Sequence, residues 1–392
     1  MQFFRLPCVF SAAFFILKGD SMKILHTSDL HLGITLNGIN FIGYQQALPD
    51  IMAETVKREN IGCVIIAGDV FNRAQGSAEA YTLYDRLLTK LCTECKVPTI
   101  VISGNHDSGA RISACSELVK SSGLYLFGGY SEDITPVSIE NADIYPLPFF
   151  ESGSVGEHLS DGDAMKQTLD RVREKMDSSR KNILVSHCFA AGGETCESDI
   201  SARAAAVGGE NAVPVSAFLD FDYVALGHIH RPQTVKADNL IRYSGTPFKY
   251  SFSEAEQEKS FTVYDTESGE ISLVPVPDII PLRVIKGTFD EIIKSAENDE
   301  KKDDLIKIIV TDRFAGASVY RPLKEIYPNL LQFEGAAVRA AAQAKISSRE
   351  LSEMSPEKLA DMYVSDRTGS EMNDEQRRWF ADAVREVMKE GE

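Results

Sequence analysis

Residues Met22 to Gly33 read MKILHTSDLHLG. The segment begins as a β-rich run over 23–28 and ends in a polar loop that contains Asp29 and His31. A strand that ends in a carboxylate and an imidazole presents two side chains that can bind a metal ion. The segment therefore predicts a buried strand followed by a functional loop.

The same arrangement recurs along the chain. Four later strand-like runs each end in metal-competent residues: 63–67 before Gly68-Asp69, 99–103 before Gly104-Asn105-His106-Asp107, 182–186 before His187, and 223–226 before Gly227-His228-Ile229-His230. Helical patterns at 44–59, 79–91 and 165–176 lie between some of these runs. The alternation predicts an α/β domain of layered sheet and helices, with its site beyond the carboxyl ends of the strands.

These motifs contain most of the histidines of the chain, because only His26 and His158 lie outside them. The candidate metal ligands are Asp29, His31, Asp69, Asn105, His187, His228 and His230. A single catalytic zinc needs about three protein ligands, so this set predicts two metal ions. Asp69 stands alone on its strand end and is the expected bridge. Imidazoles with oxygen ligands and no thiolate suit manganese, iron or zinc.

Two divalent ions roughly 4 Å apart can activate water and neutralise a phosphoryl group, so the motifs predict phosphoester hydrolysis. His106 directly follows the candidate ligand Asn105 and is the predicted catalytic acid, with Asp107 expected to fix its ring. His26 lies inside the first strand. We interpret it as structural, with support of a metal ligand as the alternative.

The second half of the chain predicts further units. A hairpin over 260–266 and 271–276 closes the first domain, which we place at 22–280. Strand and helix patterns over 281–345 predict a small α+β domain, and 346–392 reads as a linker followed by helices at 356–364 and 374–389. Both helices carry apolar stripes: Leu359, Met362 and Tyr363 in one, and Phe380, Val384 and Val387 beside Trp379 in the other. These stripes either pack on the chain itself or dock a partner.

Charge and cysteine content bound the possible functions. With 41 basic and 58 acidic side chains, the net charge of −17 excludes binding of nucleic acid through bulk charge attraction. Arg73, Arg231 and Lys249 are candidates for local phosphate contacts or plain surface charges. Seven cysteines form no recognisable disulfide framework, which predicts a reducing, cytoplasmic location. The pair Cys92-x-x-Cys95 lacks a second pair at zinc spacing and favours packing over metal or redox work.

Residues 1–21 stand apart from this pattern. They include an apolar run over 9–17 behind a single Arg5, which imitates an export signal but is too short to span a membrane. Met22 directly precedes the first strand. We expect the preceding residues to be a non-native extension from a wrongly assigned start, with an export signal as the alternative.

Together, the five motifs resemble those of the calcineurin-like metallophosphoesterases in order and spacing. Three further segments, 192–195 (GGET), 222–233 (DYVALGHIHRPQ) and 243–254 (YSGTPFKYSFSE), are similar to the nuclease subunits of SbcCD-type complexes within that family. This narrower resemblance extends from Met22 to the end of the chain.

The resemblance implies a manganese-dependent DNA nuclease with double-strand exonuclease and single-strand or hairpin endonuclease activity, acting in repair and recombination. It implies a first metal on Asp29, His31, Asp69 and His230, and a second on Asp69, Asn105, His187 and His228. His106 matches the catalytic histidine. It also makes 281–345 a capping domain, makes the last helices a docking element for an SbcC-type ATPase, and implies a homodimer within a heterotetramer, with no membrane partner.

Two other functions compete with this one. A phosphoesterase acting on small phosphodiesters would share the two-metal chemistry but would not need the residues after Pro281. A non-catalytic scaffold with a phosphoesterase fold would be expected to have lost ligands, whereas all seven are present.

Overall fold

The computed structural model describes residues 22–199, 212–236, 241–313, 315–336, 358–361, 364 and 372–390. The extension at 1–21 lies outside the described residues, as do the whole of the predicted linker and the stripe residues Met362 and Tyr363.

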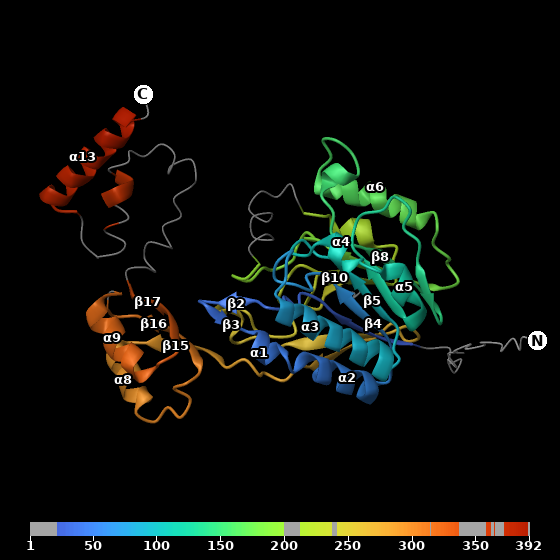
Figure 1. The fold of residues 1–392 in the computed structure, drawn as a ribbon, viewed down its shortest axis with the longest axis horizontal. Helices are drawn as coiled ribbons and strands as arrows, with labels where there is room; N and C mark the ends of the chain where they lie inside the picture. The colour runs from blue at the N-terminus through green and yellow to red at the C-terminus, as the bar shows by residue number, and fades with distance from the viewer. Residues whose placement is uncertain are drawn as a thin grey trace, which may run out of the picture.

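Two six-stranded sheets form the first domain (Figure 1). The first has the order β14–β13–β1–β4–β5–β6, with β14 at Ile271–Pro275, β13 at Ser260–Asp265, β1 at Lys23–Thr27, β4 at Ile61–Ala67, β5 at Thr99–Ile102 and β6 at Leu124–Phe127. The second has the order β11–β12–β10–β9–β8–β7, with β11 at Gln233–Thr234, β12 at Ile241–Tyr243, β10 at Tyr223–Gly227, β9 at Lys181–His187, β8 at Ala142–Leu147 and β7 at Val137–Ile139.

The two sheets pack face to face over a continuous apolar core. Ile24 and Ile65 of the first sheet and Ile183 and Ala225 of the second are all fully buried in it. These central strands are apolar on both faces because helices cover the outer face of each sheet. The five strands predicted from the sequence are thereby divided between two sheets, a division that their similar sequences did not indicate.

Helices α2 (Leu48–Glu59) and α3 (Ala78–Leu88) cover the first sheet, and α6 (Asp161–Arg173) covers the second. The predicted helix at 44–59 is two helices, α1 (Ile42–Gln45) and α2. Pro49 near the start of α2 explains the break, since proline lacks the N–H that a continuous helix would need there. Helix α3 begins at the Ser77 cap, whose side chain accepts from the Ala80 N–H, and continues past Leu88 as a π-helical turn.

Shorter elements complete this domain. They are the hairpin β2 (Thr35–Leu36) and β3 (Ile39–Asn40), helices α4 (Gly109–Ile112) and α5 (Ser116–Val119), the π-helix Thr89–Glu94, and 3-10 turns at Lys120–Ser122, Ser152–Ser154, Val215–Phe218 and Phe252–Glu254. Cys92, in the π-helix that continues α3, is buried in the apolar core, and Cys95 at its end is partly buried against that core, as the packing interpretation expected.

The carboxyl ends of the predicted strands meet at one edge of the domain. Strands β1, β4 and β5 run parallel in the first sheet, and β9 and β10 run parallel in the second. Strand β4 packs against β9 and β10 across the core, so the loops that follow all five strands come together.

A small module follows at 282–334. It consists of β15 (Leu282–Gly287), α8 (Phe289–Ala296), β16 (Leu305–Val310), α9 (Ala317–Ile326) and β17 (Leu330–Glu334), with the three strands parallel. Thr288 and Glu291 form a capping box at the start of α8. Strand β17 was not predicted. The Asn37 amide between β2 and β3 donates to the Leu331 carbonyl at 2.7 Å and ties the module to the first domain.

The last element is helix α13 (Asp374–Glu390), close to the predicted 374–389 (Figure 1). Its Trp379 is 66% exposed. Among the described residues, no helix is both long enough and apolar enough to cross a membrane.

Candidate metal centre

The loops after β1 and β4 hold their polar residues in unusual backbone conformations. Asp29, His31 and Asp69 all have positive φ, at 53°, 41° and 49°. Each such residue costs about 1 kcal/mol relative to ordinary backbone, and such strain is concentrated at functional sites. Backbone hydrogen bonds hold the two loops together: the Asp29 N–H donates to the Gly68 carbonyl at 2.9 Å, and the His31 N–H to the Asp69 carbonyl at 3.0 Å.

Gly68 lies where no other residue fits. Its φ is +88°, and a Cβ built on it would lie 2.4 Å from the Nδ1 of His187. The glycine therefore allows the loop after β4 in the first sheet to touch a histidine of the second.

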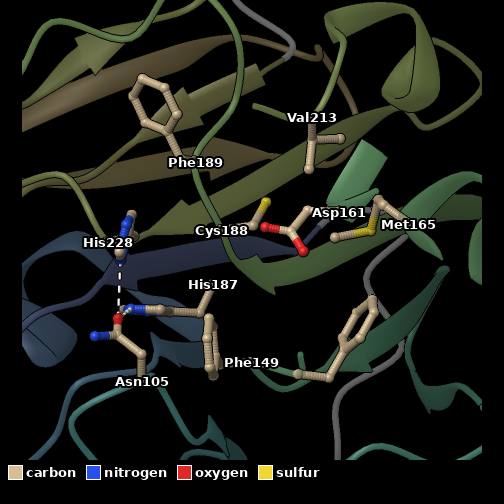
Figure 2. A pocket seen from close by; sticks show the side chains of 10 residues that line it. Asn105, Phe149, Asp161, Met165, His187, Cys188, Phe189, Val213 and His228 are labelled. Carbon is tan, nitrogen blue, oxygen red and sulfur yellow. Dashed lines mark hydrogen bonds between the residues drawn. The ribbon is translucent and has the colours of Figure 1, made fainter. Parts of the chain in front are cut away.

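All seven candidate ligands converge at this edge of the domain. His31 Nε2 lies 3.0 Å from His230 Nε2 and 3.6 Å from Asp69 Oδ2, and His187 Nε2 lies 3.5 Å from the same carboxylate oxygen. The Asn105 Oδ1 atom lies 3.0 Å from His187 Nε2 and 2.9 Å from His228 Nδ1 (Figure 2). The backbone N–H of His228 donates to both oxygens of Asp29, at 3.0 and 3.1 Å. The Oδ2 atom of Asp69 thus lies within 3.6 Å of both His31 and His187, and its bridging role stays a prediction.

The histidine rings are oriented as metal ligands usually are. The Nδ1–H of His187 donates to the Ala67 carbonyl at 2.9 Å, which leaves the Nε2 lone pair facing Asn105 and Asp69. The Nδ1 of His230 bonds to Ser198 Oγ at 2.8 Å, which leaves its Nε2 facing His31. Lone pairs and carboxylate oxygens this close repel one another unless a cation lies between them. The donor set therefore fits divalent metal ions.

Burial and neighbouring charges shift the pKa values of the clustered groups in different directions. Burial lowers the pKa of His31 and of His228 to about 3, so both rings are neutral and each keeps a lone pair that a metal ion can bind. Burial raises the pKa of Asp29 to about 8. At His187 burial lowers the pKa, but the Asp69 carboxylate outweighs it and raises the pKa to about 9. A proton and a metal ion thus compete for the same Nε2 lone pair of His187.

His106 lies at the rim of this cluster. Its ring packs edge to face on His31, with centroids 5.0 Å apart, and its Nδ1 bonds to the Asn72 carbonyl at 3.0 Å. Its backbone N–H donates to Asp69 Oδ1 at 2.9 Å. The ring is therefore oriented by a backbone carbonyl, not by Asp107.

The expectation that Asp107 fixes the His106 ring is therefore corrected. The Asp107 carboxylate accepts backbone N–H bonds from Val70 at 3.0 Å, Phe71 at 2.8 Å and Gly104 at 2.9 Å. Short carboxylate side chains readily bond to nearby backbone, and here the bonds link the loops after β4 and β5. Asp107 thus positions the loops that carry Asp69 and Asn105.

A buried polar network next to His230 was not predicted from the sequence. Ser198 Oγ donates to Glu254 Oε1 at 2.7 Å, and Lys259 Nζ bonds to Glu254 Oε2 at 2.6 Å and to the His230 carbonyl at 2.9 Å. Asp199 accepts the His230 backbone N–H at 3.0 Å. No sequence signal distinguishes Glu254 and Lys259, because both lie in the charged stretch 253–259 (SEAEQEK), which is typical of an exposed loop.

The other singled-out residues have simpler roles. His26 is fully buried, bonds to the Tyr223 hydroxyl at 2.8 Å and packs between the sheets, which favours the structural interpretation. Lys249 is buried and pairs with Asp278 at 2.6 Å, and Arg231 pairs with Glu194 at 2.5 Å. Of the three candidate phosphate contacts, Arg73 lines a groove beside Asn72.

Comparisons with known proteins agree with this architecture. Residues 22–232 match the family model of calcineurin-like phosphoesterases, and 279–368 match that of the type 5 capsule protein repressor C-terminal domain, SbcD_C. The SbcD subunit of the SbcCD nuclease of Staphylococcus epidermidis is 31% identical over 319 residues, which cover 79% of this chain and 84% of that protein.

Two solved structures are similar at lower levels. The protein TT1561 of Thermus thermophilus has a TM-score of 0.39 and 14% identity, covering 65% of this chain and 99% of that one. A dimetal phosphatase from Danio rerio has a TM-score of 0.38 and 12% identity, with the same coverage.

The fold and the matched region define a calcineurin-like phosphoesterase, which confirms the predicted fold class and makes the chain a metal-dependent hydrolase. Within that class, the chain belongs to the SbcD family of nuclease subunits.

Proposed function

We propose that this chain is the nuclease subunit of an SbcCD-type complex. It hydrolyses DNA phosphodiesters, as a double-strand exonuclease and as a single-strand or hairpin endonuclease, in repair and recombination. The observation that carries the proposal is the convergence of seven ligand side chains in a member of a nuclease family.

The proposed metal ligands form two sets that share Asp69. The first ion would be held by Asp29, His31, Asp69 and His230, and the second by Asp69, Asn105, His187 and His228. When bound, two divalent ions, which we propose to be Mn²⁺, would supply charge neutralisation at the phosphoryl group and would lower the pKa of an attacking water. The mixed imidazole and oxygen donor set supports manganese over a purely magnesium or calcium site.

Protonation of the leaving oxygen is the proposed role of His106. With Nδ1–H donating to the Asn72 carbonyl, Nε2 is the atom free to carry a proton to the leaving oxygen. Asp107 acts as a positioning residue, because its carboxylate holds the loop that carries His106. The Asp69 contact to the His106 N–H couples this loop to the bridging carboxylate.

We propose the following division of the chain. Residues 22–280 form the nuclease domain, 281–345 a capping domain that shapes the DNA path, and 346–392 a docking element for an SbcC-type ATPase. The exposed Trp379 on α13 supports docking of a partner. We also propose a homodimer within a heterotetramer, and a cytoplasmic location, which is supported by the six free cysteines among the described residues.

Cleavage assays test this function. Purified chain from Met22 with Mn²⁺ is expected to cut a labelled hairpin duplex, linear DNA and supercoiled DNA faster than a chromogenic phosphodiester. A preference for the small ester would instead favour the small-substrate phosphoesterase. If both metals bind and no DNA is cut, adding the SbcC-type ATPase separates a missing partner from a wrong substrate. Lack of hydrolysis of every substrate would favour a scaffold.

A further inference from the structure

A cavity of about 210 Å³ opens directly beside the candidate metal centre (Figure 2). Asn105, His187 and His228, three of the proposed ligands, form part of its wall. A group in this cavity therefore lies next to a phosphodiester held at the metal ions. None of the metal-site chemistry described above uses the rest of the cavity.

The remaining walls are aromatic and apolar. Phe149 and Phe189 line the side nearest the ligands, and Met165 lines the far side (Figure 2). Phe149 packs edge to face on His187, with centroids 6.4 Å apart. Flat aromatic walls favour a planar ring, because ring stacking adds to the burial of apolar surface.

The charges at the cavity exclude a phosphate backbone as its occupant. Among the described lining residues there is no lysine or arginine, whereas the carboxylate of Asp161 points into the space (Figure 2). A carboxylate repels a phosphate but accepts hydrogen bonds from the amino and imino groups of a base. The cavity is also smaller than the pockets that enclose drug-sized ligands, which favours a single ring system over a base pair.

We propose that this cavity binds one unstacked nucleobase of the strand being cut, beside the scissile phosphodiester. This inference rests on the proposed DNA nuclease function. The base stacks on the phenyl rings, and Asp161 accepts a hydrogen bond from its amino group. Because extraction of a base from a duplex costs unstacking energy, cleavage is faster where the flanking base is already unpaired.

The test compares an intact strand with two analogues that each lack one base. The cut position in a single-stranded oligonucleotide is mapped first, and an abasic analogue is then made at the nucleotide on either side of it. With the full chain and Mn²⁺, we expect the intact strand to exceed one of the two analogues in kcat/KM by about tenfold, the size typical of base stacking on an aromatic side chain. Equal kcat/KM for all three strands would overturn the proposal.

Two opposite variants probe the cavity itself. Phe189→Ala removes a wall, and Met165→Phe fills the space from helix α6. In each, the ratio of intact to abasic kcat/KM should fall towards one, and this ratio cancels any general damage to the metal centre. Phe289→Ala is the matched control, since it removes a ring of the same size from α8 in the small module and should keep the wild-type ratio. A wild-type ratio in both cavity variants would also overturn the proposal.

A binding measurement provides a readout independent of cleavage. The fluorescent base 2-aminopurine, placed at the sensitive nucleotide in a short duplex end, brightens when it leaves the base stack. Addition of the metal-free chain should change its emission, and Met165→Phe should abolish this change. No change on DNA binding would count against the cavity. If no DNA is cut even with the ATPase present, the nuclease function fails, whereas cleavage that is indifferent to the base refutes only the cavity proposal.

Discussion

Replacement of Lys259 by methionine would break a buried ion pair behind the metal centre. The side chains of Lys259 and Glu254 are 4% and 0% exposed, and their charged atoms are 2.6 Å apart. Loss of one partner from a buried pair leaves an uncompensated charge and costs about 3 to 5 kcal/mol. Glu254 would keep hydroxyl contacts from Ser198, Ser251 and Thr246, so we expect the lower end of that range.

Denaturant unfolding of the metal-free chain would measure this loss. A decrease of about 3 kcal/mol corresponds to a fall in Tm of roughly 10 °C for a domain of this size. The double variant Lys259→Met/Glu254→Gln removes the stranded charge and should regain part of the stability. The matched control is Lys90→Met, whose partner Asp50 lies 2.8 Å away but is 47% exposed. That change should cost less than about 1 kcal/mol.

The same variant has a functional consequence. Lys259 also bonds to the His230 carbonyl, and Glu254 reaches the His230 ring through Ser198. We therefore expect Lys259→Met to weaken Mn²⁺ binding by about tenfold, the effect typical of a lost contact behind a metal ligand, as measured by titration calorimetry. An unfolding free energy within about 1 kcal/mol of wild type, together with unchanged Mn²⁺ affinity, would refute this account of the network.

Three further predictions concern the centre itself. Asp69→Ala should abolish binding of both metals, because this carboxylate is the proposed bridge; one ion still bound, counted by elemental analysis, would contradict that role. His106→Ala should keep both metals yet lower kcat by about 10²- to 10⁴-fold, and an unchanged kcat would exclude it as the acid. Gly68→Ala should lower both stability and metal content, since its Cβ would meet the His187 ring 2.4 Å away; normal metal content in this variant would show that the loop can move.

The strands, and the clustering of the candidate ligands at their ends, were predictable because the signal is local. Each central strand is a short apolar run, and each is followed by polar side chains that are unusual in an apolar core, such as Asp29 and His187. Strand ends of this kind converge in any parallel arrangement, so the cluster followed without knowledge of the partner strands. The assignment of β1 and β9 to different sheets depends on long-range packing, which their similar composition does not encode.

The roles that the sequence did not indicate all depend on contacts between distant segments. Asp107 is adjacent to His106 in sequence, yet its carboxylate faces the backbone of Val70 and Phe71. Glu254 and Lys259 lie more than twenty residues from His230 in sequence but touch its surroundings. Strand β17 was missed although its sequence, LLQFE, is rich in apolar residues; its parallel pairing with β16 is the long-range contact that identifies it.

Because the candidate ligands are divided between two sheets, they are not all present at the same time while the protein is being synthesised. Asp29, His31, Asp69 and Asn105 lie in the first half of the nuclease domain, whereas His187, His228 and His230 follow more than eighty residues later. A nascent chain that has emerged only as far as β8 holds four of the seven proposed ligands and lacks the facing half of the cluster. An enzyme that cuts nucleic acid thus stays inactive on the ribosome until residue 230 has been added and both sheets have closed on each other.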